Sequence, residues 1–204
     1  TVVVFSVDHG DRMGEHGIVS KCGFEEGSVR VPLIIGGPAV PLETRGFRSA
    51  SPVSFLDLFP TFLDLAGGDI PDYCQGMSLL PIVTGQADHV HDAVFSEIAN
   101  GKSFNYMVRD RQWKWYTHGR SGKECLFDMV TDPRETDNLA SQPGHAGTTQ
   151  RLRDRLLTFL MSTQLNHARG YRILFDRIGM TFPTEDHEER KRIIHKRLCE
   201  VHDA

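Results

Sequence analysis

The chain has 204 residues, of which 39% are hydrophobic and 25% are charged, and its 23 Lys and Arg against 27 Asp and Glu give a formal net charge of −4. This length suits one domain, or a domain with a small lobe, and it can bury enough surface to fold without a disulfide scaffold. The slightly acidic balance disfavours a nucleic-acid partner, because nucleic-acid binders usually present a basic face. No apolar run approaches the roughly 20 residues of a membrane-spanning helix, so we expect no membrane partner either.

The chain begins with an apolar run, residues 1–7, of the kind that forms a strand buried on both faces of a parallel sheet. No initiator methionine or leader precedes this run, so we expect further sequence upstream. Asp8 and His9 follow directly, at a strand end, where the sites of open α/β sheets gather. Five glycines in the stretch up to residue 28 predict a long, shaped loop instead of a helix.

Residues 29–38 predict a second short strand, whose start at Pro32 lies at an edge or outside the ladder. Residues 69–91 are rich in loop signals and contain one short apolar turn at residues 79–83. Between these segments, a capping hydroxyl and a proline at residues 51–52 predict a helix start.

The apolar residues that follow this start have helical spacing, and Gly67-Gly68 predicts where the helix ends. We expect Pro60 to break or kink the helix near its middle, because proline lacks the N–H that a helix interior requires.

Beyond residue 92 the pattern changes to four short strand candidates with turn signals between them. Their spacing predicts an antiparallel sheet linked by hairpins, with strands at residues 93–98, 104–109, 112–117 and 124–129. A helix capped by Thr148 or Thr149 is expected next, with a stripe of Leu and Phe along one face. A charged helix from about Thr184 ends the chain.

The four cysteines are scattered, at positions 22, 74, 125 and 199, and none has the C-x-x-C spacing of a zinc or redox motif. An even number permits disulfides, but free thiols are the better interpretation of this spacing.

The strongest local group of reactive side chains is Asp8-His9-Gly10, with Lys21 behind it. A carboxylate and a neutral imidazole can both bind a divalent cation, although a hard cation needs several more oxygen ligands. A lysine nearby can bind an anionic oxygen as a point charge. Taken alone, however, D-H-G fits an ordinary polar turn at a strand end better than a site.

The wider pattern goes further than this turn. Residues 7–17, V-D-H-G-D-R-M-G-E-H-G, are followed by Lys21 and by E-E-G-S-V-R-V-P-L-I-I at residues 25–35, and this series resembles the sulfatase family. Further segments fit the same family in the same order, namely residues 51–53, 57–67, 75–81, 108–109, 113–114, 126–129, 132–135 and 138–140. The resemblance runs from residue 1 to about residue 165.

The resemblance implies an α/β fold, namely the C-terminal part of an alkaline-phosphatase-like three-layer core, with a small antiparallel sheet and helix subdomain. Residues 1–91 would form the core part with its metal loop, residues 92–170 the small subdomain, and residues 171–204 a C-terminal helical extension. That extension could reach a neighbouring subunit, so a homo-oligomer is one expectation.

By matching positions, the resemblance makes Asp8 and His9 two ligands of a divalent cation, and Lys21 the family lysine at the sulfate and its leaving oxygen. It implies hydrolysis of a small anionic sulfate ester by a formylglycine nucleophile, with calcium as the expected cation. Formylglycine forms in a C/S-x-P-x-R motif, and no cysteine or serine of this chain stands in one. We therefore expect the nucleophile upstream, and the 204-residue chain alone to be inactive.

Two other interpretations stay open. The segment K-C-G-F-E-E-G-S-V-R-V-P-L, residues 21–33, also looks like the phosphonate monoester hydrolase branch of the same superfamily, for which manganese or zinc would be expected. A non-catalytic remnant that uses the fold for binding is the second alternative. His16 could face the substrate or the ligands, or could be a loop histidine bonded to backbone.

Overall fold

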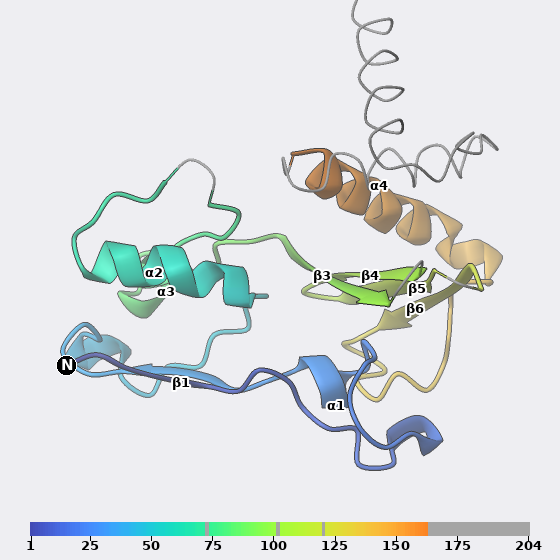
Figure 1. The fold of residues 1–204 in the computed structure, drawn as a ribbon, viewed down its shortest axis with the longest axis horizontal. Helices are drawn as coiled ribbons and strands as arrows, with labels where there is room; N and C mark the ends of the chain where they lie inside the picture. Colours follow the sequence, from blue (N-terminus) through green and yellow to red (C-terminus); the bar gives the residue numbers. More distant parts are fainter. Residues whose placement is uncertain (72–73, 101–102, 120, 163–204) are drawn as a thin grey trace, which may run out of the picture. The chain divides into compact units, whose positions relative to one another are not determined.

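A computed structural model describes residues 1–71, 74–100, 103–119 and 121–162 (Figure 1). The chain divides into two compact units, Thr1–Thr149 and Gln150–Ala204, and each is described by itself. The expected C-terminal helix from Thr184 and Cys199 lie outside the described residues. Within the described ranges, no helix is both long and apolar enough to cross a membrane.

Strands β1 (Val3–Ser6) and β2 (Leu33–Gly36) pair with each other in antiparallel register, with Phe5 opposite Ile34. A parallel pairing is therefore wrong for these two strands. Val3, Phe5 and Ile34 share one face of this pair and are 54–61% exposed. An apolar run indicates that both faces favour burial, but it does not encode the direction of the neighbouring strand. Pro32 lies outside the ladder, as predicted.

The long link between these strands is mostly irregular, as the glycines predict. It contains the 3-10 turn η1 (Glu15–Gly17) and, at its end, the one-turn helix α1 (Glu26–Val29). The backbone N–H of Gly10 donates to the carbonyl of Ser28 over 2.8 Å, so the two ends of this link meet. We call residues 10–28 the lysine loop, because it carries Lys21.

Helix α2 (Leu58–Leu65) follows the 3-10 turn η3 (Phe55–Asp57). The cap is Ser54 and not residues 51–52: its hydroxyl accepts from Leu56 N while Asp57 accepts from Ser54 N, which is a capping box. The expected break at Pro60 is also wrong, because Pro60 lies in the first turn, where a missing N–H costs no intrahelical bond.

The end of α2 is the predicted one. Gly67 has φ 71, and the N–H groups of Gly67 and Gly68 donate to the carbonyls of Asp64 and Leu63, which forms a Schellman motif. Two short turns complete this region, η2 (Leu42–Thr44) and α3 (Leu80–Val83), and the second is the expected apolar turn.

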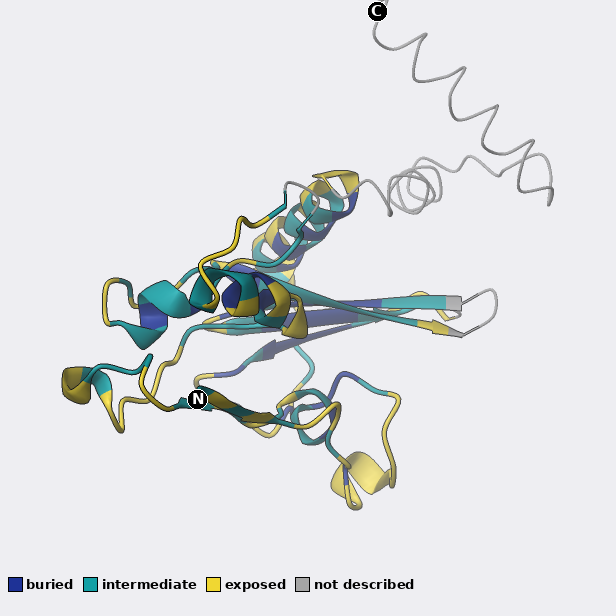
Figure 2. Cartoon of the chain, turned by 60° about the vertical axis from the view of Figure 1, so that its left-hand side comes forward, coloured by how far each residue is buried: buried dark blue, intermediate teal, exposed yellow. Residues whose placement is uncertain are grey.

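The predicted antiparallel sheet is confirmed, with strand order β3-β4-β5-β6. Its strands are β3 (Ala93–Asn100), β4 (Ser103–Asp110), β5 (Trp113–His118) and β6 (Lys123–Asp128). Because side chains alternate between the two faces, Val108, Trp115 and Leu126 lie side by side on one face and are nearly inaccessible. Figure 2 shows the middle of the sheet buried while its ends are mostly intermediate in exposure.

The opposite face of this sheet packs against the lysine loop. Phe24 is 2% exposed and joins a core cluster of sheet residues, namely Met107, Tyr116, Cys125, Phe127 and Met129. The rings of Phe24 and Tyr116 lie 5.8 Å apart at a tilted angle. The loop that carries Lys21 is therefore anchored on the sheet.

The second unit contains most of helix α4 (Ala146–Ser162), which follows the turn η4 (Pro143–His145). The helix begins a little before the predicted caps at Thr148 or Thr149. Leu152, Leu156 and Leu160 are buried at four-residue intervals, which confirms the predicted stripe.

Candidate active site

Asp8 and His9 lie where β1 gives way to the lysine loop. The Oδ1 of Asp8 accepts the backbone N–H of His9 over 3.0 Å, and its Oδ2 lies 3.6 Å from His9 Nε2. The Asp8 side chain is 87% exposed, so its second oxygen is open to a ligand. A carboxylate oxygen and an imidazole nitrogen thus face the same small region.

The ring of His9 is oriented by a backbone carbonyl. Its Nδ1 lies 2.9 Å from the Gly10 carbonyl oxygen, which can only accept, so Nδ1 carries the proton. Nε2 then presents a lone pair, and the Lys21 ammonium donates to it over 2.8 Å. Twelve residues separate Lys21 from His9 in sequence, so the lysine loop brings together all three residues that the sequence singles out.

Lys21 sits at a strained turn. Its neighbours Ser20 and Cys22 have φ values of 80 and 77, and Met13 and His16 on the same loop have φ values of 50 and 53. Such left-handed conformations cost non-glycine residues on the order of 1–3 kcal/mol each, and they persist only where surrounding contacts hold them. His16 is exposed in η1.

At Ser20 and Lys21 such contacts come from Arg12, a residue that the sequence did not single out. Its guanidinium is buried and bonds in three directions: Nε donates to the Ser20 carbonyl over 3.0 Å, one NH2 nitrogen to the Lys21 carbonyl over 2.8 Å, and the other to Glu25 over 3.0 Å. The Arg12 and Glu25 side chains are only 7% and 11% exposed. Arg12 therefore fixes the backbone on which Lys21 stands.

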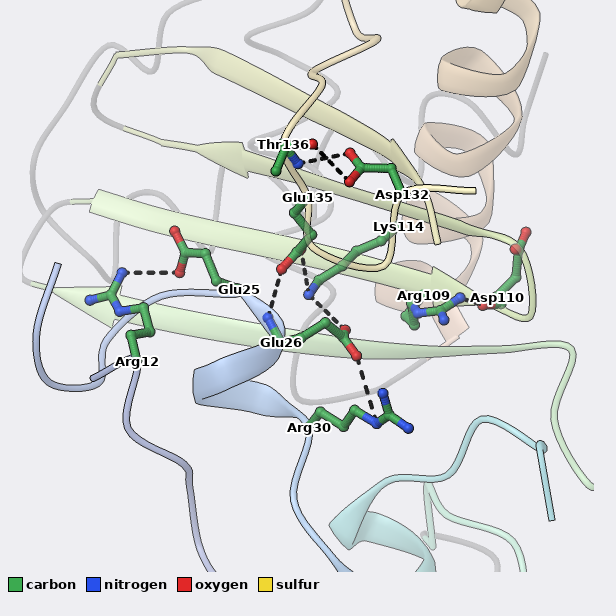
Figure 3. Close-up of polar contacts among 10 residues, drawn as sticks. All are labelled: Arg12, Glu25, Glu26, Arg30, Arg109, Asp110, Lys114, Asp132, Glu135 and Thr136. Atoms are coloured by element: carbon green, nitrogen blue, oxygen red, sulfur yellow. Dashed lines mark hydrogen bonds and ion pairs between the residues drawn. The ribbon is translucent and has the colours of Figure 1, made fainter. Parts of the chain in front are cut away.

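Glu26, the next residue, binds a different cation (Figure 3). Lys114 of β5 is fully buried, and its Nζ lies 2.9 Å from Glu26 Oε1 and 2.8 Å from Glu135 Oε1. The second oxygen of Glu135 accepts the Glu26 backbone N–H over 2.7 Å. We call Glu26, Lys114 and Glu135 the anchor cluster, because it ties α1 to the sheet.

The anchor cluster also neutralises a cross-strand pair of cations. Arg109 of β4 is directly opposite Lys114 of β5, an arrangement that repels without counter-charges. Burial lowers the pKa of Arg109, and the carboxylates of Glu26 and Glu135 oppose that shift. Charged residues usually lie at the surface, so nothing in the sequence indicated that the charged residues of the anchor cluster would be buried. Their one signal was indirect, since Lys114 and Glu135 lie in segments of the family resemblance.

Three cysteines fall among the described residues, and all are free thiols: Cys22 is exposed, Cys74 partly buried and Cys125 buried. The prediction of free thiols is confirmed for these three. Burial raises the pKa of Cys125, which therefore behaves as a core residue and not as a nucleophile.

A metal-binding group of three or more His, Cys, Asp or Glu is absent from the part of the chain that the structure describes. Asp8 and His9 suit a divalent cation in donor chemistry, but two ligands fill only part of a coordination shell. His9 Nε2 has one lone pair, so it can bind either such a cation or the Lys21 ammonium that it accepts from in the structure, but not both at once.

Comparisons with known proteins agree with this architecture. The family model for N-sulphoglucosamine sulphohydrolase, C-terminal, matches residues 14–162. The choline-sulfatase of Rhizobium meliloti (strain 1021) is 40% identical over 147 residues, which cover 70% of this chain and 28% of that protein. The chain thus spans less than a third of that relative.

Two solved structures show the same fold. A 2-O GAG sulfatase has a TM-score of 0.71 and 31% identity, covering 80% of this chain and 37% of that chain. The phosphonate monoester hydrolase of Agrobacterium radiobacter has a TM-score of 0.68 and 28% identity, covering 78% of this chain and 34% of that chain. Since the family model spans most of the described residues, the chain belongs to the sulfatase family, in the C-terminal part of its α/β, alkaline-phosphatase-like fold.

Proposed function

We propose that this chain supplies part of the active site of a hydrolase that cleaves sulfate esters. In this proposal Asp8 and His9 are two ligands of a divalent cation, and Lys21 acts at the departing ester oxygen. The observation that carries the proposal is the approach of the Lys21 ammonium to within 2.8 Å of His9 Nε2. It puts a fixed positive charge beside the two candidate ligands, as the substrate's anionic oxygens require.

The cation side of the site rests on donor chemistry. Asp8 offers an open carboxylate oxygen, and the bond from His9 Nδ1 to the Gly10 carbonyl fixes the tautomer whose Nε2 carries a lone pair. In the structure this lone pair accepts from Lys21, so a bound cation would replace that hydrogen bond and free the ammonium for the substrate. A bound cation, with calcium as our first choice, supplies neutralisation of the anionic sulfate oxygens. Its remaining ligands would come from sequence outside these 204 residues.

Lys21 serves the other end of the ester bond. When the sulfur–oxygen bond breaks, negative charge develops on the departing oxygen, which needs a proton or a hydrogen-bond donor. An ammonium has three N–H donors, and only one is directed at His9 Nε2. The other two remain to bind a sulfate oxygen and to protonate the alcohol as it leaves.

The nucleophile is proposed to lie outside this chain. The family's formylglycine would form in a C/S-x-P-x-R motif, and the 204 residues contain none. The 204-residue chain by itself should therefore have no sulfatase turnover. Turnover by this chain alone at the rate of a full enzyme would refute the assignment.

Phosphonate monoester hydrolysis is the second candidate, with manganese or zinc as the cation. The similarity to the Agrobacterium radiobacter hydrolase favours it, because that protein shares 28% identity with this chain at a TM-score of 0.68. Sulfate and phosphonate esters are both tetrahedral anions, so the same cation and lysine could serve either substrate.

The deciding experiment compares an aryl sulfate with a phenyl phosphonate on the full-length gene product, with metal content measured in the same preparation. We expect turnover of the sulfate, and a loss of both bound metal and turnover in Asp8→Asn. Asp88→Asn is the matched control, since Asp88 is an exposed carboxylate that bonds His89 and Arg111 elsewhere. Turnover of the phosphonate alone would establish the second candidate.

A further inference from the structure

Arg12 has a bonding pattern that general stability does not explain. An ion pair buried as deeply as Arg12 and Glu25 contributes little net stability, because two charges lose their hydration and an apolar pair of similar volume is often as stable. Here the rest of the guanidinium bonds to two consecutive carbonyls, those of Ser20 and Lys21. These bonds restrain the positions of the two carbonyls, because the planar guanidinium can bond all its partners in only a few arrangements.

The two carbonyls belong to the turn that presents the lysine. Ser20 and Cys22, on either side of Lys21, both have positive φ, so this backbone holds its shape only under external restraint. The Ser20 N–H also donates to Asp11 Oδ1 over 2.7 Å. Lys21 itself is exposed, so its side-chain packing does not restrain it. Its position therefore depends on what holds its backbone.

We propose that Arg12 is a positioning residue that sets where the Lys21 ammonium stands relative to His9. Glu25 orients the guanidinium, and the adjacent Glu26 ties the same stretch of backbone to β5 through Lys114. The sheet thus holds Glu26, the adjacent Glu25 holds Arg12, and Arg12 holds the turn at Lys21. This inference rests on the proposed function of Lys21 at the departing oxygen.

The variant that tests this role is Arg12→Lys, which keeps the positive charge but has one nitrogen in place of the three that bond Ser20, Lys21 and Glu25. We expect kcat in the full-length gene product to fall roughly 10- to 100-fold with little change in KM, because misplacing a group that acts on the departing oxygen affects the transition state more than substrate binding. Arg30→Lys is the control, since the Arg30 side chain is 78% exposed and lies 4.0 Å from Glu26.

A series of aryl sulfates with leaving groups of increasing pKa gives a readout that lost stability alone would not change. Loss of Lys21 should hurt poor leaving groups most, and Arg12→Lys should steepen the same dependence. In the double variant Arg12→Lys/Lys21→Ala, the Arg12 change should add little to the effect of Lys21→Ala, because both act through one group. Additive effects with an unchanged leaving-group dependence would overturn the proposal.

Glu25→Gln covers the case in which Arg12→Lys does not fold. It keeps an acceptor for Arg12 but removes the charge that orients the guanidinium, so we expect the same change in leaving-group dependence at a smaller amplitude. If Lys21→Ala steepens the dependence and neither Arg12→Lys nor Glu25→Gln does, the positioning role is wrong while the function of Lys21 stands. If Lys21→Ala itself has no effect, both are wrong.

Discussion

Glu25 and Glu26 are consecutive residues whose carboxylates bind cations from opposite directions. Glu25 pairs with Arg12, inside the lysine loop, over 3.0 Å, and Glu26 pairs with Lys114, in the sheet, over 2.9 Å. One peptide unit thus links the loop that carries Lys21 to the four-stranded sheet. Both pairs are buried or nearly so. The first pair holds the geometry of the turn at Lys21, and the second pair contributes to the stability of the fold.

Lys21→Ala should lower kcat of the full-length gene product by about 10²- to 10⁴-fold, the usual contribution of general acid catalysis. The folded state should be little affected, because the Lys21 side chain is exposed. Steady-state kinetics and thermal unfolding measure the two effects separately. Lys123→Ala, at an exposed lysine of β6, is the control; an unchanged kcat in Lys21→Ala would mean that Lys21 is only a loop residue.

Lys114→Met should destabilise the protein by about 3–5 kcal/mol, since it leaves the carboxylates of Glu26 and Glu135 without their buried counter-charge. Urea unfolding measures this loss. The triple variant Lys114→Met/Glu26→Gln/Glu135→Gln should recover part of the stability, because it removes the uncompensated charges as well. If Lys114→Met unfolded at the wild-type urea midpoint, the anchor cluster would have no role in stability.

Gly10→Ala should destabilise the lysine loop. A Cβ at this position would lie 2.1 Å from the carbonyl oxygen of Gly27, so the bond from Gly10 N–H to Ser28 must break or lengthen. We expect a cost of about 1–3 kcal/mol, the ordinary range for lost buried hydrogen bonds and strain. Gly36→Ala is the control, because nothing lies within 4 Å of its Cβ. Equal unfolding midpoints for the two variants would contradict the close approach.

Asp132 should make stability depend on pH in the acid range. Its carboxylate accepts N–H bonds from Asp137 and Thr136, and the bond from Asp137 contributes most to lowering the pKa of Asp132 below its usual value. Because the folded-state pKa is the lower one, the stabilisation is present above the unfolded-state pKa of about 3.9 and is lost as pH falls through the folded-state value.

The Asp132→Asn variant tests this dependence. Free energies of unfolding measured between pH 6 and pH 2 should show a shallower acid decline in the variant than in the wild type. The Asp132 turn also holds Glu135, whose φ is 58, so the variant should weaken the anchor cluster at neutral pH. Identical acid slopes in the two proteins would show that Asp132 has no linked proton.

The contrast between the two sheets shows what the sequence could predict. Strands β3 to β6 alternate in polarity and are joined by recognisable turns, so their pairing follows from local signals. The direction of β2 relative to β1 depends on the path of the long, irregular link between them. No local sequence signal predicts that path. The Ser54 cap was a missed signal, because Ser54 and Asp57 stand at capping-box spacing in the sequence.

The site divides in the same way. Asp8, His9 and Lys21 could be named because reactive side chains cluster at a strand end and fit a family pattern. Arg12 and Glu25 could not be paired from sequence, since thirteen positions separate them and burial of a charge depends on what the rest of the fold places around it. The sequence therefore predicted which three residues lie together, and their roles stay predictions, whereas the residues that hold the backbone at Lys21 in place required coordinates.

The bond between Gly10 and Ser28 separates the lysine loop into a closed base and an outward tip. Residues 13–19 of the tip are exposed, and the bond from the Gly10 N–H to the Ser28 carbonyl, which closes the base, does not involve them. Lengthening a loop whose ends are already joined costs little entropy, about 0.6 kcal/mol for each doubling of its length. Insertions and substitutions at the tip can therefore accumulate while the geometry at Lys21 stays constant, so this protein can diversify its outer surface without rebuilding its chemistry.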